Sequence, residues 1–423
     1  MSTHPVRVAL LGFGTVGRSV ARILVERRPA GLRLTHVFNR HVARKREDWV
    51  PADVRWTEDI EEIFASDAEL LVELIGGREP AGAWVRRALE SGRSVVTANK
   101  QLIAHEGPDL LRVASACRRH LRFEAAVGGG IPVIGALREG IAGDCLERVA
   151  GILNGTCNYI LSSMEADGAT FADALARAQA LGFAEADPTD DVEGYDARAK
   201  LAILCAVALR QHVPPADIAC RPITVVEAVD FEYASELGCT IRQISQAALD
   251  GSRVVASVRP SLVDRRSPLA RVEGSQNLIV ARGRYGGDTV YSGAGAGGGP
   301  TSVAVVSDLL AVAGLEAGCF AAVLPGAPSR VDSEFVTAHY LRFVVRDRPG
   351  ILAAIARIMA GHGINIDAVL QRPAPSKDAL PFVVTAEPCP PATLAAALDE
   401  ITGLDFHVQA PVDLPLLRNG AAA

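Results

Sequence analysis

The chain has 423 residues, of which 49% are hydrophobic and 22% charged, a composition typical of folded domains that excludes a disordered or fibrous protein. Its 43 basic and 49 acidic residues give a net charge of −6, and no run of like charges indicates a nucleic-acid or membrane partner. No stretch is apolar over the roughly 18 residues that a membrane span needs, and no cleavable leader is evident, so we expect a cytoplasmic protein.

The first 135 residues predict a doubly wound parallel sheet. Short apolar strands are expected over 6–11, 32–38, 70–74, 94–97 and 121–125, with helical stretches between them. Such alternation of strands and helices is typical of a Rossmann-type α/β fold, which binds its ligand at the carboxyl ends of the strands.

A glycine-rich turn follows the first strand and opens a helix. It reads Gly12-Phe13-Gly14-Thr15-Val16-Gly17. A G-x-G-x-x-G turn between a strand and a helix is typical of a site for the pyrophosphate of a dinucleotide, because the helix N-terminus offers free N–H groups there. A turn that serves only the packing of helix on strand is the alternative interpretation.

Arg40 stands at the end of the second strand, where NAD-specific folds carry an acidic residue. An arginine at this position suits the 2′-phosphate of NADP. The sequence therefore favours NADP, with NAD as the other possibility. A solvated basic surface is the plainer alternative, because Arg44, Lys45 and Arg46 follow closely.

Residues 136–299 predict a second, α+β domain. A strand over 149–153 is followed by a helix that ends at Leu181, an acidic loop, a helix through Leu209 and strands between 253 and 293. Asp196 and Lys200 are four residues apart on one helix and share a face. An exposed ion pair with little energetic value is the plainer interpretation.

The scarcity of lysine makes each lysine informative. Only four of the 43 basic residues are lysine, at positions 45, 100, 200 and 377. Arginine can replace a surface lysine, but it cannot replace one that must exchange a proton. Lys200 and Lys100, which follows the strand over 94–97, are therefore candidate catalytic residues.

The remainder of the chain predicts a helix, a linker and a third domain. After the glycine run 293–299, a helix over 300–318 is expected to pack back onto the first domain. A proline-containing linker covers 320–336. Residues 337–415 alternate as βαββαβ, which predicts a small ferredoxin-like module.

The motifs at 12–17, 97–100, 124–132, 151–160, 182–200 and 293–301 together resemble those of homoserine dehydrogenase, and the tail is similar to an ACT domain. The resemblance implies reversible, NAD(P)H-dependent reduction of L-aspartate 4-semialdehyde to L-homoserine, on the route to threonine, methionine and isoleucine. It also implies that residues 136–299 form the domain for substrate binding, catalysis and dimerisation. Feedback inhibition by threonine through the ACT domain and a homodimer or homotetramer are implied as well. A chain that ends near Pro325 is then expected to keep turnover and lose inhibition.

The resemblance further implies roles for individual residues. Lys200 would donate the proton to the aldehyde oxygen, and Lys100 would lie beside substrate and cofactor. The implied substrate-binding residues are Glu185, Asp191 and Asp196. The implied cofactor-binding residues are Gly12, Phe13, Gly14, Thr15, Val16, Gly17, Arg40, Lys100, Gly182 and Gly297. A monovalent cation, sodium in the family, would be held mostly by main-chain carbonyls of Glu124, Val127, Gly129 and Ile131.

Two other functions stay open on the sequence. Cys157 could be the thiol nucleophile of an acylating semialdehyde dehydrogenase, which carries its substrate as a thioester. That chemistry needs a histidine base, and His212 is the only histidine between residues 141 and 300. A sensor of dinucleotide and amino acid without catalysis, built from the same parts, is the second alternative.

Overall fold

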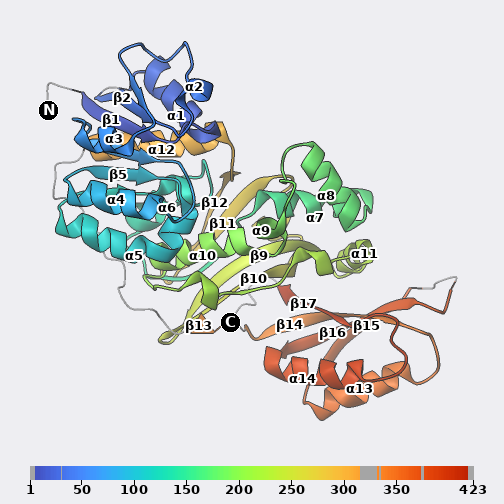
Figure 1. The fold of residues 1–423 in the computed structure, drawn as a ribbon. Helices are drawn as coiled ribbons and strands as arrows, with labels where there is room; N and C mark the ends of the chain where they lie inside the picture. The colour runs from blue at the N-terminus through green and yellow to red at the C-terminus, as the bar shows by residue number, and fades with distance from the viewer. Residues whose placement is uncertain (1–4, 30, 315–330, 333–334, 373–375, 418–423) are drawn as a thin grey trace.

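The computed structural model describes residues 5–29, 31–314, 331–332, 335–372 and 376–417. Three regions follow one another along the molecule, from the blue N-terminal sheet through a green and yellow middle to a red C-terminal module (Figure 1). In these described ranges, no helix has both the length and the apolarity to cross a membrane.

The N-terminal region is a parallel sheet, as predicted, and it has six strands. Its strands are β1 (Val6–Leu11), β2 (Leu32–Phe38), β3 (Arg55–Thr57), β4 (Leu70–Glu73), β5 (Ser94–Thr97) and β6 (Leu121–Arg122), in the order β3-β2-β1-β4-β5-β6. The helices between them are α1 (Thr15–Glu26), α2 (Val42–Lys45), α3 (Ile60–Ala65), α4 (Ala81–Glu90) and α5 (Lys100–Ala116). This strand order is that of a dinucleotide-binding fold.

Two details of this sheet differ from the prediction. The three-residue strand β3 was not expected, because so short a segment carries little periodic signal. The last strand ends at Arg122 rather than at residue 125, because Glu124–Ala126 forms a turn of 3₁₀-helix. The Glu124 N–H donates to Asp308 Oδ2 at 2.7 Å and is thereby lost to strand pairing.

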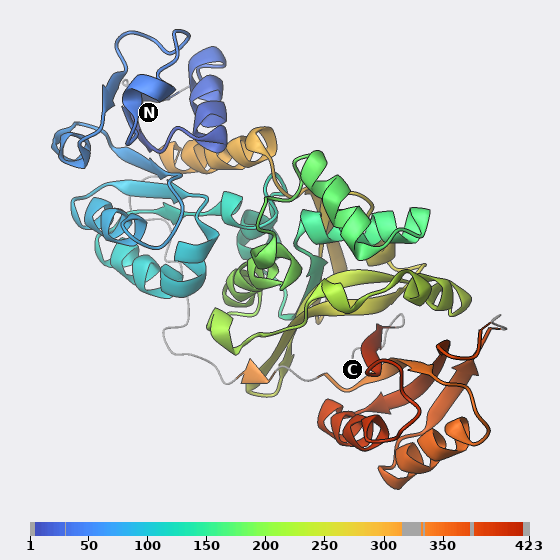
Figure 2. The same ribbon diagram turned by 45° about the vertical axis from the view of Figure 1, so that its right-hand side comes forward.

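Helix α12 (Gly298–Ala313) returns from the middle of the chain to the N-terminal sheet. It contacts α1, and its apolar side shares a core with Val8, Leu10 and Val20. The amber α12 lies beside the blue α1 in two views (Figures 1 and 2). The chain therefore leaves this fold after Arg122 of β6 and comes back to it at Gly298, 176 residues later.

The middle region is built on antiparallel strands. They are β7 (Leu146–Ile152), β9 (Cys239–Asp250), β10 (Arg253–Asp264), β11 (Gln276–Gly283) and β12 (Gly287–Ala294), in the order β12-β11-β7-β9-β10, and the short β8 (Ala219–Cys220) pairs with β10. The helices are α6 (Val133–Gly135), α7 (Gly155–Asp167), α8 (Phe171–Ala180), α9 (Thr189–Val192), α10 (Tyr195–Ala208) and α11 (Ala228–Glu236). Helices α7 and α10 contact β9 and cover one face of this sheet.

The single helix expected up to Leu181 is wrong. Two helices form instead, because Gly168 ends α7 in a left-handed conformation with φ +63° and Thr170 caps α8 by accepting from the Asp173 N–H. Strand β9 was not predicted. Its inward positions carry polar side chains, among them Gln243 and Ser245, which are nevertheless buried.

The C-terminal module has the predicted ferredoxin-like fold. Its elements are β14 (Thr337–Val345), α13 (Ile351–Gly361), β15 (Ile366–Leu370), β16 (Leu380–Cys389), α14 (Pro391–Thr402) and β17 (Val412–Leu417), with strand order β17-β14-β16-β15. Leu341 and Phe343 of β14 pack against both helices. The predicted fold class of the whole chain is thus confirmed.

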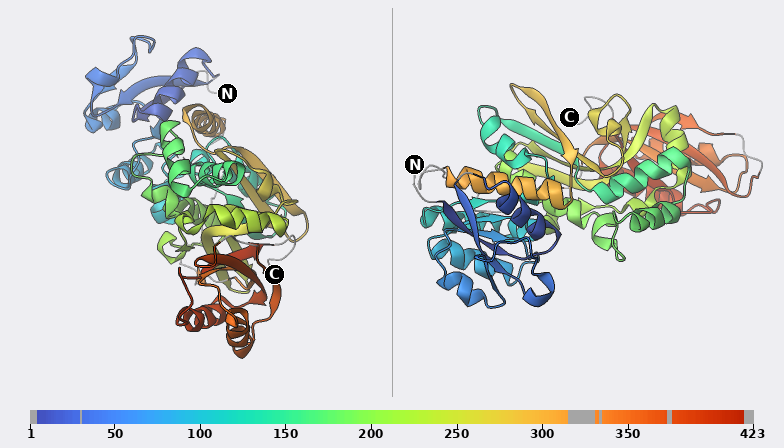
Figure 3. Two further views of the ribbon diagram at one scale, coloured as in Figure 1. Left: turned by 90° about the vertical axis from the view of Figure 1, so that its right-hand side faces the viewer. Right: turned by 90° about the horizontal axis from the view of Figure 1, so that it is seen from above.

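This module is joined to the middle region through its sheet. Strand β17 pairs in parallel with β10, Leu416 opposite Leu262, so that the two sheets form one 11-stranded sheet. The red module continues the yellow and green region in both views of Figure 3. Most of the expected linker 320–336 lies outside the described residues, while β13 (Val331–Asp332) pairs with β10.

A buried ion pair lies at the same junction. The Arg342 Nε of β14 lies 2.8 Å from Asp230 Oδ1 of α11, and the Tyr340 hydroxyl donates to that oxygen at 2.7 Å. Asp230 is 0% exposed. Because an unpaired charge at such a site is costly, the pair ties the module to α11 of the middle region.

Candidate active site

Asp196 binds two lysines that come from different regions of the chain. Its Oδ1 lies 2.5 Å from Lys100 Nζ, and its Oδ2 accepts a hydrogen bond of 2.7 Å from Lys200 Nζ. Lys100 is the first residue of α5, where Asn99 caps the helix, and Lys200 follows Asp196 by one turn of α10. The cluster lies at the carboxyl end of β5, where a Rossmann-type fold places its ligand.

Burial separates this cluster from an exposed ion pair. Asp196 is 5% exposed and Lys200 9%. Burial alone would raise the pKa of Asp196, but Lys200 and Lys100 lower it well below its usual range. Burial would lower the pKa of Lys100, yet the Asp196 carboxylate raises it above its usual value. Asp196 is therefore ionised and Lys100 protonated near neutral pH.

Asn154 forms a second layer behind the cluster. Its Oδ1 caps α7 by accepting from the Cys157 N–H at 2.8 Å. Its Nδ2 donates to Asp191 Oδ1 at 2.6 Å and to Asp196 Oδ2 at 2.9 Å. One amide thus holds two carboxylates side by side. The sequence shows an asparagine suited to a helix N-cap, but not that its amide group bridges residues 37 and 42 positions away.

The structure brings together only two of the three residues expected to bind the substrate. Asp191 joins the cluster through Asn154, and burial raises the pKa of its carboxyl. Glu185 lies on the exposed loop before α9, where its main-chain oxygen accepts from Gln179 Nε2 at 3.0 Å. Within the described ranges its carboxylate contacts neither the lysines nor another partner.

The glycine turn after β1 has the geometry that a pyrophosphate needs. Gly12 has φ +97°, and a Cβ there would lie 2.8 Å from the Leu74 carbonyl oxygen. A Cβ on Gly17 would lie 2.1 Å from the Gly12 oxygen. No side chain caps the first turn of α1. Its N–H groups are therefore available to an anion.

A second helix N-terminus meets the first at this place. A Cβ on Gly298 would lie 2.9 Å from Ser19 Oγ and 3.0 Å from Thr15 Cγ2. Gly297, with φ +115°, precedes α12. The positive ends of α1 and α12 therefore converge, which favours a negatively charged ligand. Gly182, also expected near the cofactor, is an exposed residue after α8 with φ +75°.

Arg40 is exposed beyond β2. The neighbouring Asn39 Oδ1 accepts from the His41 N–H at 3.0 Å and shapes the turn. Among the described residues, no acidic side chain pairs with Arg40. Its guanidinium is thus accessible to a phosphate.

The residues expected at a cation lie on one loop between β6 and α6. The carboxylate of Glu124 is already engaged, because its two oxygens accept from the Ile134 and Gly135 N–H groups at 2.7 Å each. Gly129 has φ +54° and lies against Gly295. In the part of the chain that the structure describes, no group of three His, Cys, Asp or Glu side chains could hold a metal ion. A cation here would depend on main-chain oxygens.

Cys157 is not placed as a nucleophile. It is 0% exposed, and its Sγ donates to the Asp191 carbonyl oxygen at 3.1 Å. Burial raises the pKa of the thiol well above its usual value. A thioester mechanism needs an accessible thiolate, so the structure argues against the acylating alternative.

Replacing Cys157 by serine should leave kcat within about threefold of wild type, because a hydroxyl can make the same hydrogen bond. We expect at most a modest loss of stability, measured as Tm. A loss of kcat beyond about 100-fold, with a normal Tm, would support thiol chemistry instead.

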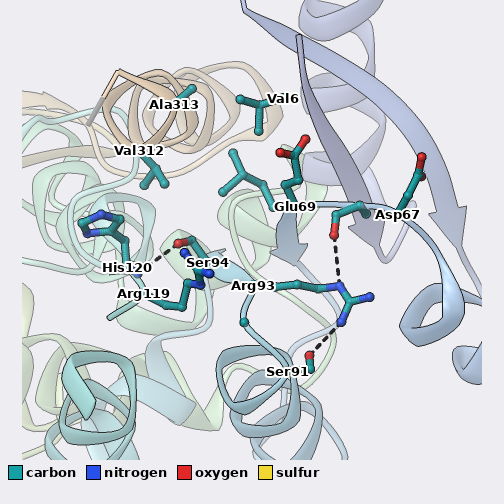
Figure 4. Close-up of a pocket in the computed structure, with 13 residues that line it drawn as sticks. Val6, Asp67, Glu69, Ser91, Arg93, Ser94, Arg119, His120, Val312 and Ala313 are labelled. Carbon is teal, nitrogen blue, oxygen red and sulfur yellow. Dashed lines mark hydrogen bonds between the residues drawn. The ribbon is translucent and has the colours of Figure 1, made fainter. Parts of the chain in front are cut away.

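A cavity of about 400 Å³ lies elsewhere, at the opposite edge of the parallel sheet (Figure 4). It is lined by residues at the amino ends of the strands, including Val6, Leu70 and Ser94. Arg93 Nη1 donates to Ser91 Oγ at 2.7 Å at its rim. Ligands of doubly wound sheets bind at the carboxyl ends, so this cavity is not the dinucleotide site.

The doubly wound sheet, its uncapped glycine turn and the buried lysine pair define a dinucleotide-dependent oxidoreductase. The family model described as homoserine dehydrogenase matches residues 132–310, that of the homoserine dehydrogenase NAD-binding domain matches 12–124, and that of the ACT domain matches 339–405. The chain belongs to the homoserine dehydrogenase family. It is an enzyme that uses a nicotinamide cofactor. This excludes the alternative function of a non-catalytic sensor of dinucleotide and amino acid.

Relatives and solved structures agree with this assignment. Homoserine dehydrogenase of Mycobacterium tuberculosis (strain H37Rv) is 44% identical over 388 residues, 87% of this chain and 86% of the relative. That of Bacillus subtilis is 35% identical over 391 residues, 90% of each chain. A homoserine dehydrogenase structure from Thiobacillus denitrificans has a TM-score of 0.89 and 35% identity, covering 98% of this chain and 99% of that one. A hyperthermophilic archaeal homoserine dehydrogenase in complex with NADPH has a TM-score of 0.63 and 29% identity over 73% and 97% of the chains.

Proposed function

We propose that the chain reduces L-aspartate 4-semialdehyde reversibly to L-homoserine with NADPH, on the route to threonine, methionine and isoleucine. The observation that carries this proposal is Asp196 between Lys100 and Lys200, at the border of the dinucleotide-binding and middle regions. Reduction of an aldehyde requires a hydride at the carbonyl carbon and a proton at its oxygen. A buried lysine beside the dinucleotide site can supply the proton.

Lys200 is the proposed proton donor. Its ammonium group has three N–H donors, of which one binds Asp196 Oδ2 and another the Leu153 carbonyl oxygen at 2.8 Å. The third is available to the aldehyde oxygen, to which Lys200 gives its proton as the oxygen becomes an alkoxide. Asp196 stays ionised and keeps the charged lysine in place. The bound nicotinamide would supply the hydride.

Lys100 and the carboxylates have positioning roles in this proposal. Lys100 is partly exposed, with 39% of its side chain accessible, so it can contact substrate and cofactor from the other side of Asp196. Asp191 and Glu185 would bind the substrate ammonium, because a carboxylate forms its strongest hydrogen bonds with charged donors. Glu185 would have to reach the substrate from its exposed loop.

Turnover by the purified full-length chain tests the proposal. Oxidation of NADPH on addition of aspartate 4-semialdehyde, and its reversal with homoserine and NADP, should both be observed. Formation of an acyl phosphate from aspartate 4-semialdehyde, inorganic phosphate and NADP, with reduction of NADP to NADPH, would instead indicate the thioester reaction. No turnover in either assay would contradict both.

NADPH should be preferred over NADH if Arg40 binds the 2′-phosphate. Arg40→Asp is expected to raise the KM for NADPH by at least about 10-fold, because it replaces a charge-assisted bond by repulsion, and to change the KM for NADH little. Lys45→Asp makes a similar charge change at an exposed neighbouring residue and controls for general electrostatics. An equal rise in KM for both cofactors would show that Arg40 does not bind the 2′-phosphate.

The remaining proposals concern ligands that act at a distance from the reaction. Main-chain oxygens of Glu124, Val127, Gly129 and Ile131 would hold sodium. A rise in Tm on adding sodium, with no rise on adding a large organic cation, would support this proposal.

The ACT domain would bind threonine and inhibit the enzyme allosterically in a homodimer or homotetramer. Millimolar threonine without effect on the full-length enzyme would contradict this assignment.

A further inference from the structure

The Leu153 carbonyl oxygen holds the head of Lys200 together with a second side chain. It accepts from Lys200 Nζ at 2.8 Å and from Asn277 Nδ2 at 3.0 Å. A carbonyl with two donors has both lone pairs engaged, so its direction is fixed. The position of the Lys200 ammonium group therefore depends on Asn277 as well as on Asp196.

Asn277 lies between this anchor and the glycine segment that precedes α12. In the β-ladder it faces Gly293 of β12, and its neighbour Leu278 faces Ile152 of β7. Its amide lies against Gly295, where an added Cβ would come within 2.1 Å of Asn277 Cγ. The side chain thus touches, on one side, the support of Lys200 and, on the other, the segment that ends at Gly297.

The chemistry of Asn277 is unusual for its surroundings. It is 1% exposed, and its Oδ1 has no hydrogen-bond partner among the described groups. Turning the amide round would place Oδ1 against the Leu153 oxygen, which is repulsive, so the donor must face Leu153. A buried amide that satisfies only its donor costs free energy that an apolar side chain of the same size would avoid. The donor function explains its presence.

We propose that Asn277 is a positioning residue that ties the proton donor to the cofactor-side glycine segment. Through Leu153 it fixes where Lys200 presents its proton, and through Gly295 it fixes that point relative to the segment at Gly297. Proton and hydride then reach the two ends of one C=O bond from set directions. This inference rests on the proposed roles of Lys200 and Gly297.

The test is Asn277→Leu measured in two backgrounds. In the otherwise wild-type full-length chain, kcat should fall about 10- to 100-fold, because a small misplacement of a catalytic group is costly. The KM for aspartate 4-semialdehyde and the Kd for NADPH should stay within about threefold. In a Lys200→Ala chain, adding Asn277→Leu should lower kcat by less than about threefold, because the group it positions is gone.

Asn158→Leu is the matched control. Asn158 is also a buried asparagine, 0% exposed, whose Nδ2 donates to the Val272 and Gly274 carbonyl oxygens at 3.0 and 2.9 Å and whose Oδ1 has no partner in the described ranges. None of these contacts involves Lys200. Asn158→Leu should lower Tm as much as Asn277→Leu does while kcat stays within about threefold of wild type.

Three results would overturn the inference. An equal fall of kcat in both backgrounds would show that Asn277 acts by packing. A loss confined to NADPH affinity would show that Asn277 serves the cofactor alone. An unchanged kcat would show that Asn277 does not position Lys200. If Asn277→Leu does not fold, Asn277→Ala is compared in the same backgrounds. Lys200→Ala alone reports on the proposed function, since more than a tenth of wild-type kcat there would contradict Lys200 as donor.

Discussion

Lys200→Arg should lower kcat about 10²- to 10⁴-fold, the contribution of a positioned general acid. A guanidinium keeps the positive charge but stays protonated throughout the working pH range. It must also fit a site that holds an ammonium between Asp196 Oδ2 and the Leu153 oxygen. Steady-state kinetics with saturating NADPH would show the loss mainly in kcat rather than in KM.

The other lysines of the chain supply the controls for this result. Lys45 is exposed, and Lys377 pairs with Asp347 in the ACT domain at 2.6 Å. Conversion of either to arginine should change kcat by less than about twofold. If Lys200→Arg keeps more than about a tenth of wild-type kcat and a normal Tm, a bound water or another group is the acid.

A chain that ends near Pro325 should be much less stable than the full-length protein. Removing the ACT domain takes Tyr340, Leu414 and Leu416 out of the core that they share with Ile241 and Leu262, and a large apolar side chain lost from a core costs about 2–5 kcal/mol. It also exposes the β10 edge that β17 covers. At about 2–4 °C per kcal/mol, we expect Tm to fall by about 10 °C, with aggregation in size-exclusion chromatography.

Two substitutions in the full-length chain separate the causes. Arg342→Leu leaves Asp230 buried without its partner, which typically costs about 3–5 kcal/mol, and should lower Tm by a similar amount. Arg348→Leu removes an exposed partner of Asp405, and exposed pairs contribute only about 0–1 kcal/mol, so Tm should barely change. A truncated chain with full stability and turnover would show that the ACT domain is detachable, as the sequence alone suggests.

The fold was predictable where the pattern was local. Short apolar strands and the glycine turn 12–17 predict the parallel sheet, and the pattern of residues 337–415 predicts the ferredoxin-like module. Strand β9 was missed because its inward positions carry polar residues such as Gln243 and Ser245, which are buried only because α7 and α10 cover them. Hydrophobic periodicity cannot show a buried polar strand.

The candidate site was predictable in its residue types but not in its connections. The scarcity of lysine singles out Lys100 and Lys200, and the acidic helix singles out Asp196. The contact of Lys100 with Asp196 joins two regions nearly one hundred residues apart, and that of Asn277 with Leu153 spans 124 residues. No local rule indicates such pairs, because they depend on how the two regions dock.

The pairing of β17 with β10 has a consequence for how the protein is made. The ribosome completes β10 at Asp264, but its partner strand β17 begins only at Val412, 148 residues later. Until then, β10 has open N–H and C=O groups around Leu262 and Val263 and can pair with other nascent chains. Slow translation after residue 264, or early termination, should therefore favour inclusion bodies, and a chaperone that covers strand edges should raise the soluble yield more than one that acts after release.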